Sequence, residues 1–214
     1  GLFLGVGSSN SERAGNLVLR SGSSDDAYGG GVNLLAGTSK SYTGGSVKLL
    51  TGNGHASGSL TLITASNQNS ASAGVSVVTG SGKTSGNILL SVGEASSQGG
   101  NFLVFSGKTT SRSGSVSISA GSSHLLTGGH TRINSGQSSS STSGSVLIST
   151  GRAMSTGSSG AIKLSSGISK EGNSGSINVR SGDSVKESGA IKIEVGSSTA
   201  SQSGSIIFNV GGSA

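Results

Sequence analysis

The stretch Ser143-Gly144-Ser145-Val146-Leu147-Ile148-Ser149-Thr150-Gly151 contains the pattern that decides the fold. Similar stretches follow at residues 159–167 and 174–182. In general form the pattern is small–Gly–x–Φ–x–Φ–x–small–Gly, where Φ is an aliphatic or aromatic residue, and a polar stretch follows it. Because the pattern returns about every 15 residues from one end of the chain to the other, it predicts a repeat architecture.

Each repeat carries two apolar positions separated by one residue, and fifteen such repeats are found in the 214 residues. Apolar residues spaced two apart are typical of a β-strand with one buried face. A helix is disfavoured because the chain contains 40 glycines and many Ser and Thr residues, which lower helix stability. The candidate core residues in six of the repeats are Leu17, Leu19, Val47, Leu49, Ile88, Leu90, Val116, Ile118, Val146, Ile148, Ile177 and Val179.

We therefore expect residues 1–214 to form one continuous all-β domain. The expected fold is a single-stranded parallel β-solenoid, or flattened β-helix, of about 15 coils with about 15 residues each and right-handed winding. Apolar core positions lie close to both ends of the chain, at Leu2 and Leu4 and at Ile206, Phe208 and Val210, and no capping element accompanies them. Since open solenoid ends pair with further strands, the segment is expected to belong to a longer array or filament.

Small residues flank the apolar pair of nearly every repeat. Glycine occupies the position before the strand in thirteen repeats, and Ser, Thr, Ala or Val precedes the closing glycine. These glycines are expected at tight corners, where a positive φ angle is often required. A further small residue, such as Ser24 or Ser123, follows the closing glycine by two positions. It is expected to face the aliphatic strand across a thin core.

Composition restricts the function classes. The chain has no Pro, Cys or Trp, only 3% aromatic residues and a net charge of +6. The lack of cysteine rules out a disulfide framework, and no apolar run is long enough to span a membrane. Because the Lys and Arg residues are scattered and no aromatic residues alternate with them, nucleic-acid binding is not expected. Weak attraction to an acidic polysaccharide is the partner class that this charge leaves open.

The ionisable residues do not form a recognisable catalytic or metal-binding motif. Asp25 and Asp26 are adjacent and are expected to point apart in a solvated turn. His55, His124 and His130 lie in polar stretches without neighbouring Cys or paired carboxylates, whereas metal sites need such clusters. We therefore expect neither an enzyme nor a bound metal or cofactor.

Several repeats also carry apolar residues at positions that should point outward. Leu35, Leu50, Ile63 and Val78 occupy the same outward position in four successive repeats, and we call these four residues the apolar stripe. Contiguous exposed apolar patches mark contact surfaces, although a turn folded over the stripe is the alternative explanation. The full set of candidate lateral contacts is Val18, Leu35, Leu50, Ile63, Val78, Leu89, Leu103 and Phe105.

The unit Ser-Gly-Ser-Val/Ile-x-Leu/Ile-x-Ser/Thr-Gly, with its Ser-rich spacers, resembles the Gly/Ser-rich tandem arrays of secreted repeat proteins of algae, of the stramenopile or diatom type. The resemblance covers the whole chain and implies an extracellular or cell-surface structural component. Together these features predict a building block of a fibre, filament or appendage that assembles with copies of itself, end to end and laterally. An ice-binding solenoid and a polysaccharide-binding adhesin stalk are the alternatives, although Lys48 and Arg132 interrupt the flat outward column that ice binding needs.

Overall fold

The computed structural model describes residues 1–10, 13–67 and 71–212. The chain divides into an N-terminal half, Gly1–Val104, and a C-terminal half, Phe105–Ala214. Each half is built from the same element, which is an extended segment that carries the apolar pair and ends in a bend. The two halves are described separately below.

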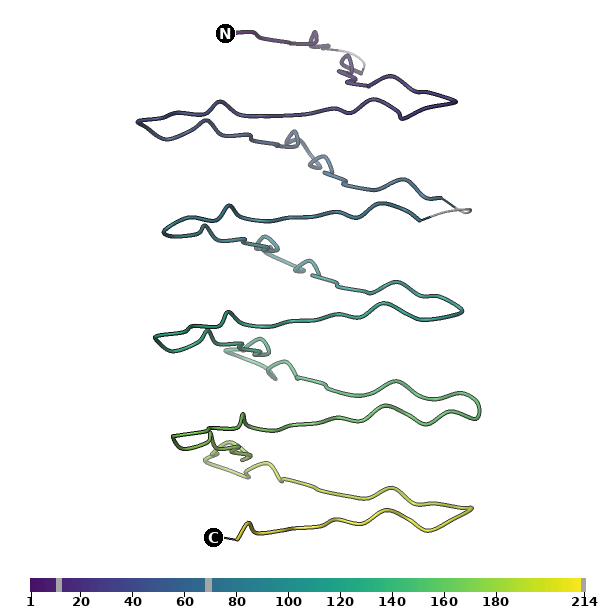
Figure 1. Cartoon of the computed structure of the whole chain (residues 1–214), viewed down its shortest axis with the longest axis vertical. Helices are drawn as coiled ribbons and strands as arrows, with labels where there is room; N and C mark the ends of the chain where they lie inside the picture. Colours follow the sequence, from purple (N-terminus) through teal and green to yellow (C-terminus); the bar gives the residue numbers. More distant parts are fainter. Residues whose placement is uncertain (11–12, 68–70, 213–214) are drawn as a thin grey trace. The chain divides into compact units, whose positions relative to one another are not determined.

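No helix and no paired strand is present among the described residues. The described residues instead alternate extended segments with short bends (Figure 1). In the N-terminal half the bends beyond the first repeat lie at residues 25–27, 40–42, 54–56, 82–84 and 96–97. In the C-terminal half they lie at residues 110–112, 124–126, 139–141, 155–157, 170–172, 185–186 and 199–201.

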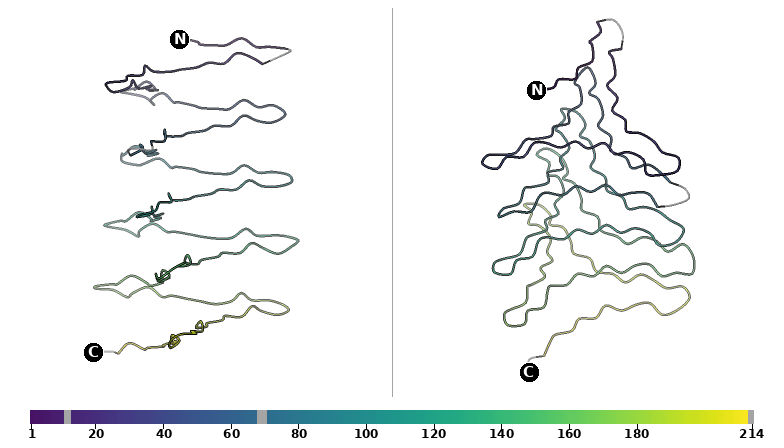
Figure 2. Two further views of the ribbon diagram at one scale, coloured as in Figure 1. Left: turned by 90° about the vertical axis from the view of Figure 1, so that its right-hand side faces the viewer. Right: turned by 45° about the horizontal axis from the view of Figure 1, so that its top comes forward.

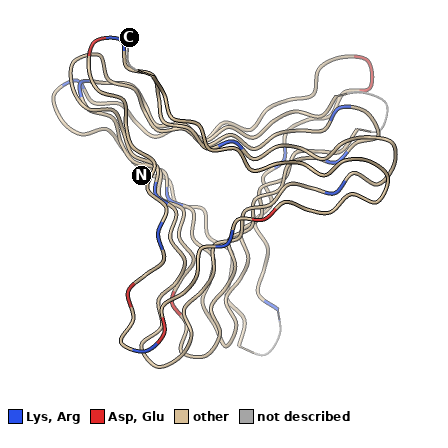
Figure 3. Cartoon of the chain, turned by 90° about the horizontal axis from the view of Figure 1, so that it is seen from below, with Lys and Arg blue, Asp and Glu red and all other residues tan. Residues whose placement is uncertain are grey.

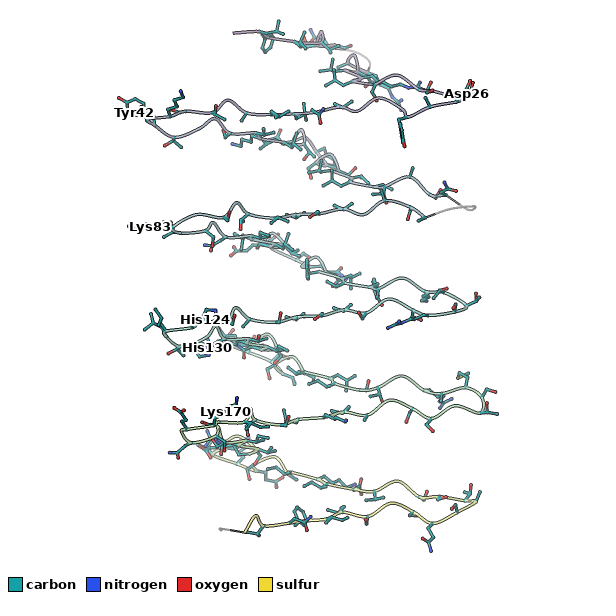
Figure 4. All side chains as sticks on the ribbon, viewed as in Figure 1. Asp26, Tyr42, Lys83, His124, His130 and Lys170 are labelled. Atoms are coloured by element: carbon teal, nitrogen blue, oxygen red, sulfur yellow. The ribbon has the colours of Figure 1, made fainter. Side chains whose placement is uncertain are left out.

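The chain winds so that three repeats complete one turn in each half. In the N-terminal half the bends at Tyr42 and Lys83 lie on one side and the bend at Asp26 lies on the other (Figure 4). In the C-terminal half the bends at His124 and Lys170, which are three repeats apart, likewise share one side. Three repeats in each turn give the winding three arms, and seen end-on the arms end in bends (Figure 3). Successive repeats of one chain therefore lie on different sides of the winding.

In the described part of the chain, six arms are closed at the base by a hydrogen bond between two glycines. The N–H of Gly30 donates to the carbonyl of Gly22 at 2.9 Å, and the N–H of Gly45 donates to the carbonyl of Gly37 at 2.8 Å. Related bonds join Gly58 to Gly52, Gly114 to Gly107, Gly129 to Gly121 and Gly144 to Gly136. The closing glycine of one repeat thus pairs with the opening glycine of the next, and the polar stretch between them forms the tip of the arm.

Close approach across this base accounts for glycine at the start of the strand in several arms. A Cβ atom on Gly45 would lie 3.2 Å from the amide nitrogen of Gly37 and 3.3 Å from the Cβ of Ala36. Ala36 is one of the few half-buried residues. The expectation of positive φ angles at the corners is wrong for the described residues, where no glycine has one. Lack of space at Gly45, rather than backbone strain, disfavours a side chain there, whereas a Cβ atom on Gly37 would meet no atom within 4 Å.

The small residue after the closing glycine has a different role from the one expected. The hydroxyl oxygen of Ser24 accepts a hydrogen bond from the N–H of Ala27 at 3.0 Å, across the bend at the tip of the arm. Ser39, Ser123, Ser138, Ser169 and Ser198 accept the same bond from the residue three positions later. These residues therefore shape the bend rather than face the aliphatic strand, since short hydroxyl side chains readily bond to nearby backbone groups.

Among the residues that the structure describes, no parallel sheet joins successive turns of the chain. Among the described residues, the six backbone hydrogen bonds all close the base of an arm, and none joins one turn of the winding to the next. The views from other directions show the extended segments of each half following one another without pairing (Figure 2). The β-solenoid therefore stays a prediction, and it concerns the assembled protein. In such an assembly, each chain would keep the backbone path of the single chain.

Candidate self-association surface

The apolar pair of each repeat is the first component of the candidate site. In the described residues no side chain is buried, so the predicted core positions are solvent-exposed in the single chain. Their exposed fractions range from 48% at Ile177 to 78% at Ile118. The lateral-contact candidates are more exposed, from 68% at Leu103 to 86% at Leu89. The alternation expected of an extended segment is therefore visible, but nothing in the chain covers either face.

The accessible surface is far too large for a folded monomer. A compact protein of 20.5 kDa would expose about 8,800 Å², and the unfolded chain about 29,700 Å². This chain exposes 22448 Å², roughly 13,600 Å² more than a compact monomer of its mass. A standard interface covers only about 800 Å² on each partner. The chain therefore presents surface along its whole length that folding of one copy leaves uncovered.

The backbone is the second component of the site. Each extended segment is a strand-like edge, and in the described residues its N–H and C=O groups form no hydrogen bond with another turn of the winding. Rows of unpaired backbone groups are templates for pairing with another chain. Because every repeat contributes such a backbone edge, a partner that pairs with all of them would need the same spacing of edges along its own chain.

The apolar stripe is not brought together within one chain. Leu35 and Val78 are three repeats apart, and the bends that follow them, at Tyr42 and Lys83, share one side (Figure 4). Leu50 and Ile63 belong to the two repeats between them. All four side chains are exposed. Val18 and Leu89 are exposed in other repeats of the N-terminal half, as is Phe105 at the start of the C-terminal half. The stripe is therefore contiguous only if successive repeats become neighbours.

In the part of the chain that the structure describes, charged residues add one ion pair to this surface. The Nζ of Lys192 lies 2.8 Å from the Oε1 of Glu194, and both side chains are largely exposed. The two residues are two positions apart, so the contact agrees with an extended backbone that places alternate side chains on one face. Other Lys, Arg, Asp and Glu residues are scattered over bends and extended segments (Figure 3). An exposed pair of this kind contributes little to stability by itself.

The described residues hold no group of three or more His, Cys, Asp and Glu side chains that could bind a metal ion. Asp25 and Asp26 occur at a bend, where they line a shallow, open depression with Ala27 and Tyr28. His124 lies in the bend at the tip of one arm, and His130 directly follows Gly129 at the base of that arm (Figure 4). No helix in the described part of the chain is long and apolar enough to cross a membrane.

Three features of this surface were missed by the sequence analysis. They are the glycine pairs at the arm bases, the hydroxyl bonds in the bends and the pairing of Lys192 with Glu194. The recurrence of Ser or Thr two residues after the closing glycine was a usable signal for the bends. The contact between glycines of successive repeats had no signal in the sequence, because it depends on the width of the arm.

No family model, curated protein or solved structure matches this chain.

Proposed function

We propose that this chain is an extracellular structural protein, a β-solenoid building block of a fibre, filament or cell-surface appendage formed by self-assembly. The observation that carries the proposal is the exposure of the apolar pairs in the described repeats between Leu17 and Ile206, apart from the repeat that has Thr131 at its first position. A chain that exposes this much apolar and backbone surface gains stability only when it is covered by other chains. The regular spacing favours a long assembly over a discrete binding site.

The extracellular location rests on the resemblance of the repeat to secreted Gly/Ser-rich arrays of algae. The Ser- and Thr-rich bends agree with a hydrated outer surface, since their hydroxyl groups already bond to the backbone within each arm. No cofactor or metal is part of the proposal, and the partner is the chain itself.

The proposal is tested by electron microscopy of the purified protein and by immunogold labelling of intact, non-permeabilised source cells. We expect fibres or rods in the purified material, an axial diffraction spacing near ~4.8 Å, and gold particles on the cell surface or its appendages. Labelling confined to the cell interior would contradict the proposal.

The same material separates the two alternative functions. Ice shaping and thermal hysteresis by the soluble protein would identify an ice-binding solenoid. Retention on an immobilised acidic polysaccharide without formation of fibres would identify an adhesin stalk. The structural proposal predicts neither result, because positive residues interrupt the outward column and are scattered along the chain.

A further inference from the structure

We propose that the partner of this chain is two further copies of itself, wound in parallel between its own successive turns to form a threefold-symmetric, intertwined trimer. The inference goes beyond the proposed function because it specifies the number of chains and the order in which their repeats stack. It holds whether or not the trimers then join into a filament.

The partner has to match the chain repeat by repeat. The described repeats present an exposed apolar pair, except the one with Thr131 and Ile133, and a backbone edge without bonds to another turn. The roughly 13,600 Å² of surface in excess of a compact monomer extends over the chain rather than forming one patch. A globular partner would cover one stretch and leave the others exposed. A second copy has the same spacing of apolar pairs and the same backbone edges, so it can pair along the whole length.

The three-armed winding determines the number of copies. A rotation of 120° about the winding axis carries each arm onto the next arm, and therefore superimposes extended segment on extended segment (Figure 3). The two rotated copies then lie one third and two thirds of the way between successive turns of the first. Adjacent parallel strands lie about 4.8 Å apart, so one chain must rise about 14 Å in each turn. A twofold rotation cannot superimpose three arms, and closed cyclic symmetry is the rule for homo-oligomers.

This arrangement has a definite stacking order. On each side of the trimer, a given repeat of one chain contacts the following repeat of the next chain. Successive repeats in the sequence therefore become neighbours in space. Two repeats that contact each other always belong to different copies. A repeat of the same chain returns to that side only after three steps, with two strands from other chains between.

The charges in the C-terminal half fit this order. Arg180 and Glu194 occupy the same outward position in successive repeats, so they would lie side by side on neighbouring chains and form an ion pair. In the other outward column, Lys48, Arg132, Lys163 and Lys192 are never in consecutive repeats. Opposite charges at neighbouring strand positions are favourable and like charges are unfavourable. Both columns therefore agree with the proposed neighbours.

The same order makes the apolar stripe contiguous. Leu35 and Val78 of one chain would be joined by Leu50 of a second chain and Ile63 of the third. By symmetry, each of the three sides of the trimer would carry one stripe. Outward apolar residues that lie on different sides of the single chain would thus form continuous stripes in the trimer.

Paired cysteines test the stacking order, because the natural chain contains none. Ser149 and Ser165 occupy the same outward position in successive repeats of the C-terminal half, and both are exposed. In the double variant S149C/S165C, the two cysteines of neighbouring chains would be close enough for a disulfide. We expect mild oxidation to convert most of the protein into a covalent three-chain species on a non-reducing gel.

The matched control is S119C/S165C, whose two positions are three repeats apart on the same side of one chain. Here two strands from other copies would separate the cysteines, and we expect no disulfide within or between chains. Circular dichroism of both reduced variants should match that of the natural chain and shows whether they assemble.

The remaining outcomes overturn the trimer. An intrachain disulfide in S149C/S165C would show that one chain stacks successive repeats on itself. An intrachain disulfide in S119C/S165C would show that one chain closes its own three-repeat turns. Linked species that stop at two chains or continue beyond three would exclude threefold symmetry. These results concern the purified protein and leave the cellular location, which tests the proposed function, as a separate question.

Discussion

At the scale of single residues, limited space is the reason for glycine at the start of the strand. Gly45 and Gly129 lie where the end of one strand meets the start of the next, with backbone or Cβ atoms 3.2 to 3.3 Å from the position that a side chain would occupy. The residue before the closing glycine belongs to the same contact. The hydroxyl of Ser21, for example, donates a hydrogen bond to the carbonyl of Gly30. Glycine before the strand and a small residue after it are two sides of one contact.

The variant Gly45→Ala tests this contact. Its new Cβ would crowd Ala36 and Gly37, and we expect the assembled protein to lose about 1 to 3 kcal/mol of stability, the usual range for overpacking. The measurement is the midpoint of thermal or denaturant unfolding.

Gly37→Ala is the control, because a Cβ at Gly37 meets no atom within 4 Å. We expect its unfolding midpoint to be unchanged or slightly raised, since alanine restricts the unfolded chain. Equal destabilisation by the two variants would contradict the account of the arm base.

At the scale of the element, one repeat is an extended segment, a closed base and a bend. The sequence predicted the extended segment and its alternation, because a period of two is a local property of the chain. It did not predict that the apolar pairs, such as Val116 and Ile118, are exposed in one copy. Which strand lies beside Val116 depends on the path of the backbone through three repeats, and the spacing within one repeat carries no information about that path.

The bend is the part of the repeat that a hydroxyl group stabilises locally. In Ser123→Ala the N–H of Leu126 loses the oxygen that accepts its hydrogen bond at 3.0 Å. We expect a loss of about 0.5 kcal/mol, at the low end for a hydrogen bond because the bend is exposed. The amide hydrogen of Leu126 should exchange faster with solvent, by hydrogen-exchange mass spectrometry.

Ser123→Thr keeps the hydroxyl group and is expected to keep the protection of the Leu126 amide. If alanine and threonine accelerate exchange equally, the hydroxyl bond does not hold the bend.

At the scale of the whole molecule, we propose that the single chain is one of three intertwined copies. The surface that one copy exposes, the three repeats in each turn and the neighbouring charges of Arg180 and Glu194 are explained together by intertwined copies. Residues at the same position of consecutive repeats still stack in one column, as the sequence predicts. In the trimer, neighbouring residues of a column belong to different chains. Sequence alone cannot distinguish the two cases, because the stacked residues are the same.

The apolar stripe provides a prediction about how trimers contact each other. Replacement of Leu50 and Ile63 by Ser removes the middle of the stripe, and we expect lateral bundling to decrease because less apolar surface is buried between assemblies. The β-sheet content and the number of chains in each assembly should not change. Light scattering and electron microscopy measure the bundling, and circular dichroism measures the sheet content. Loss of the sheet signal would instead place these residues in the core.

The central claim is that this chain completes its fold only with two other copies, and the mass of its smallest folded species tests that claim most directly. Native mass spectrometry of the unmodified protein, in a sample whose circular dichroism shows β-sheet, is the measurement. We predict a smallest species of three times 20.5 kDa, with larger species at multiples of it. A β-rich monomer of 20.5 kDa that unfolds cooperatively would contradict the account.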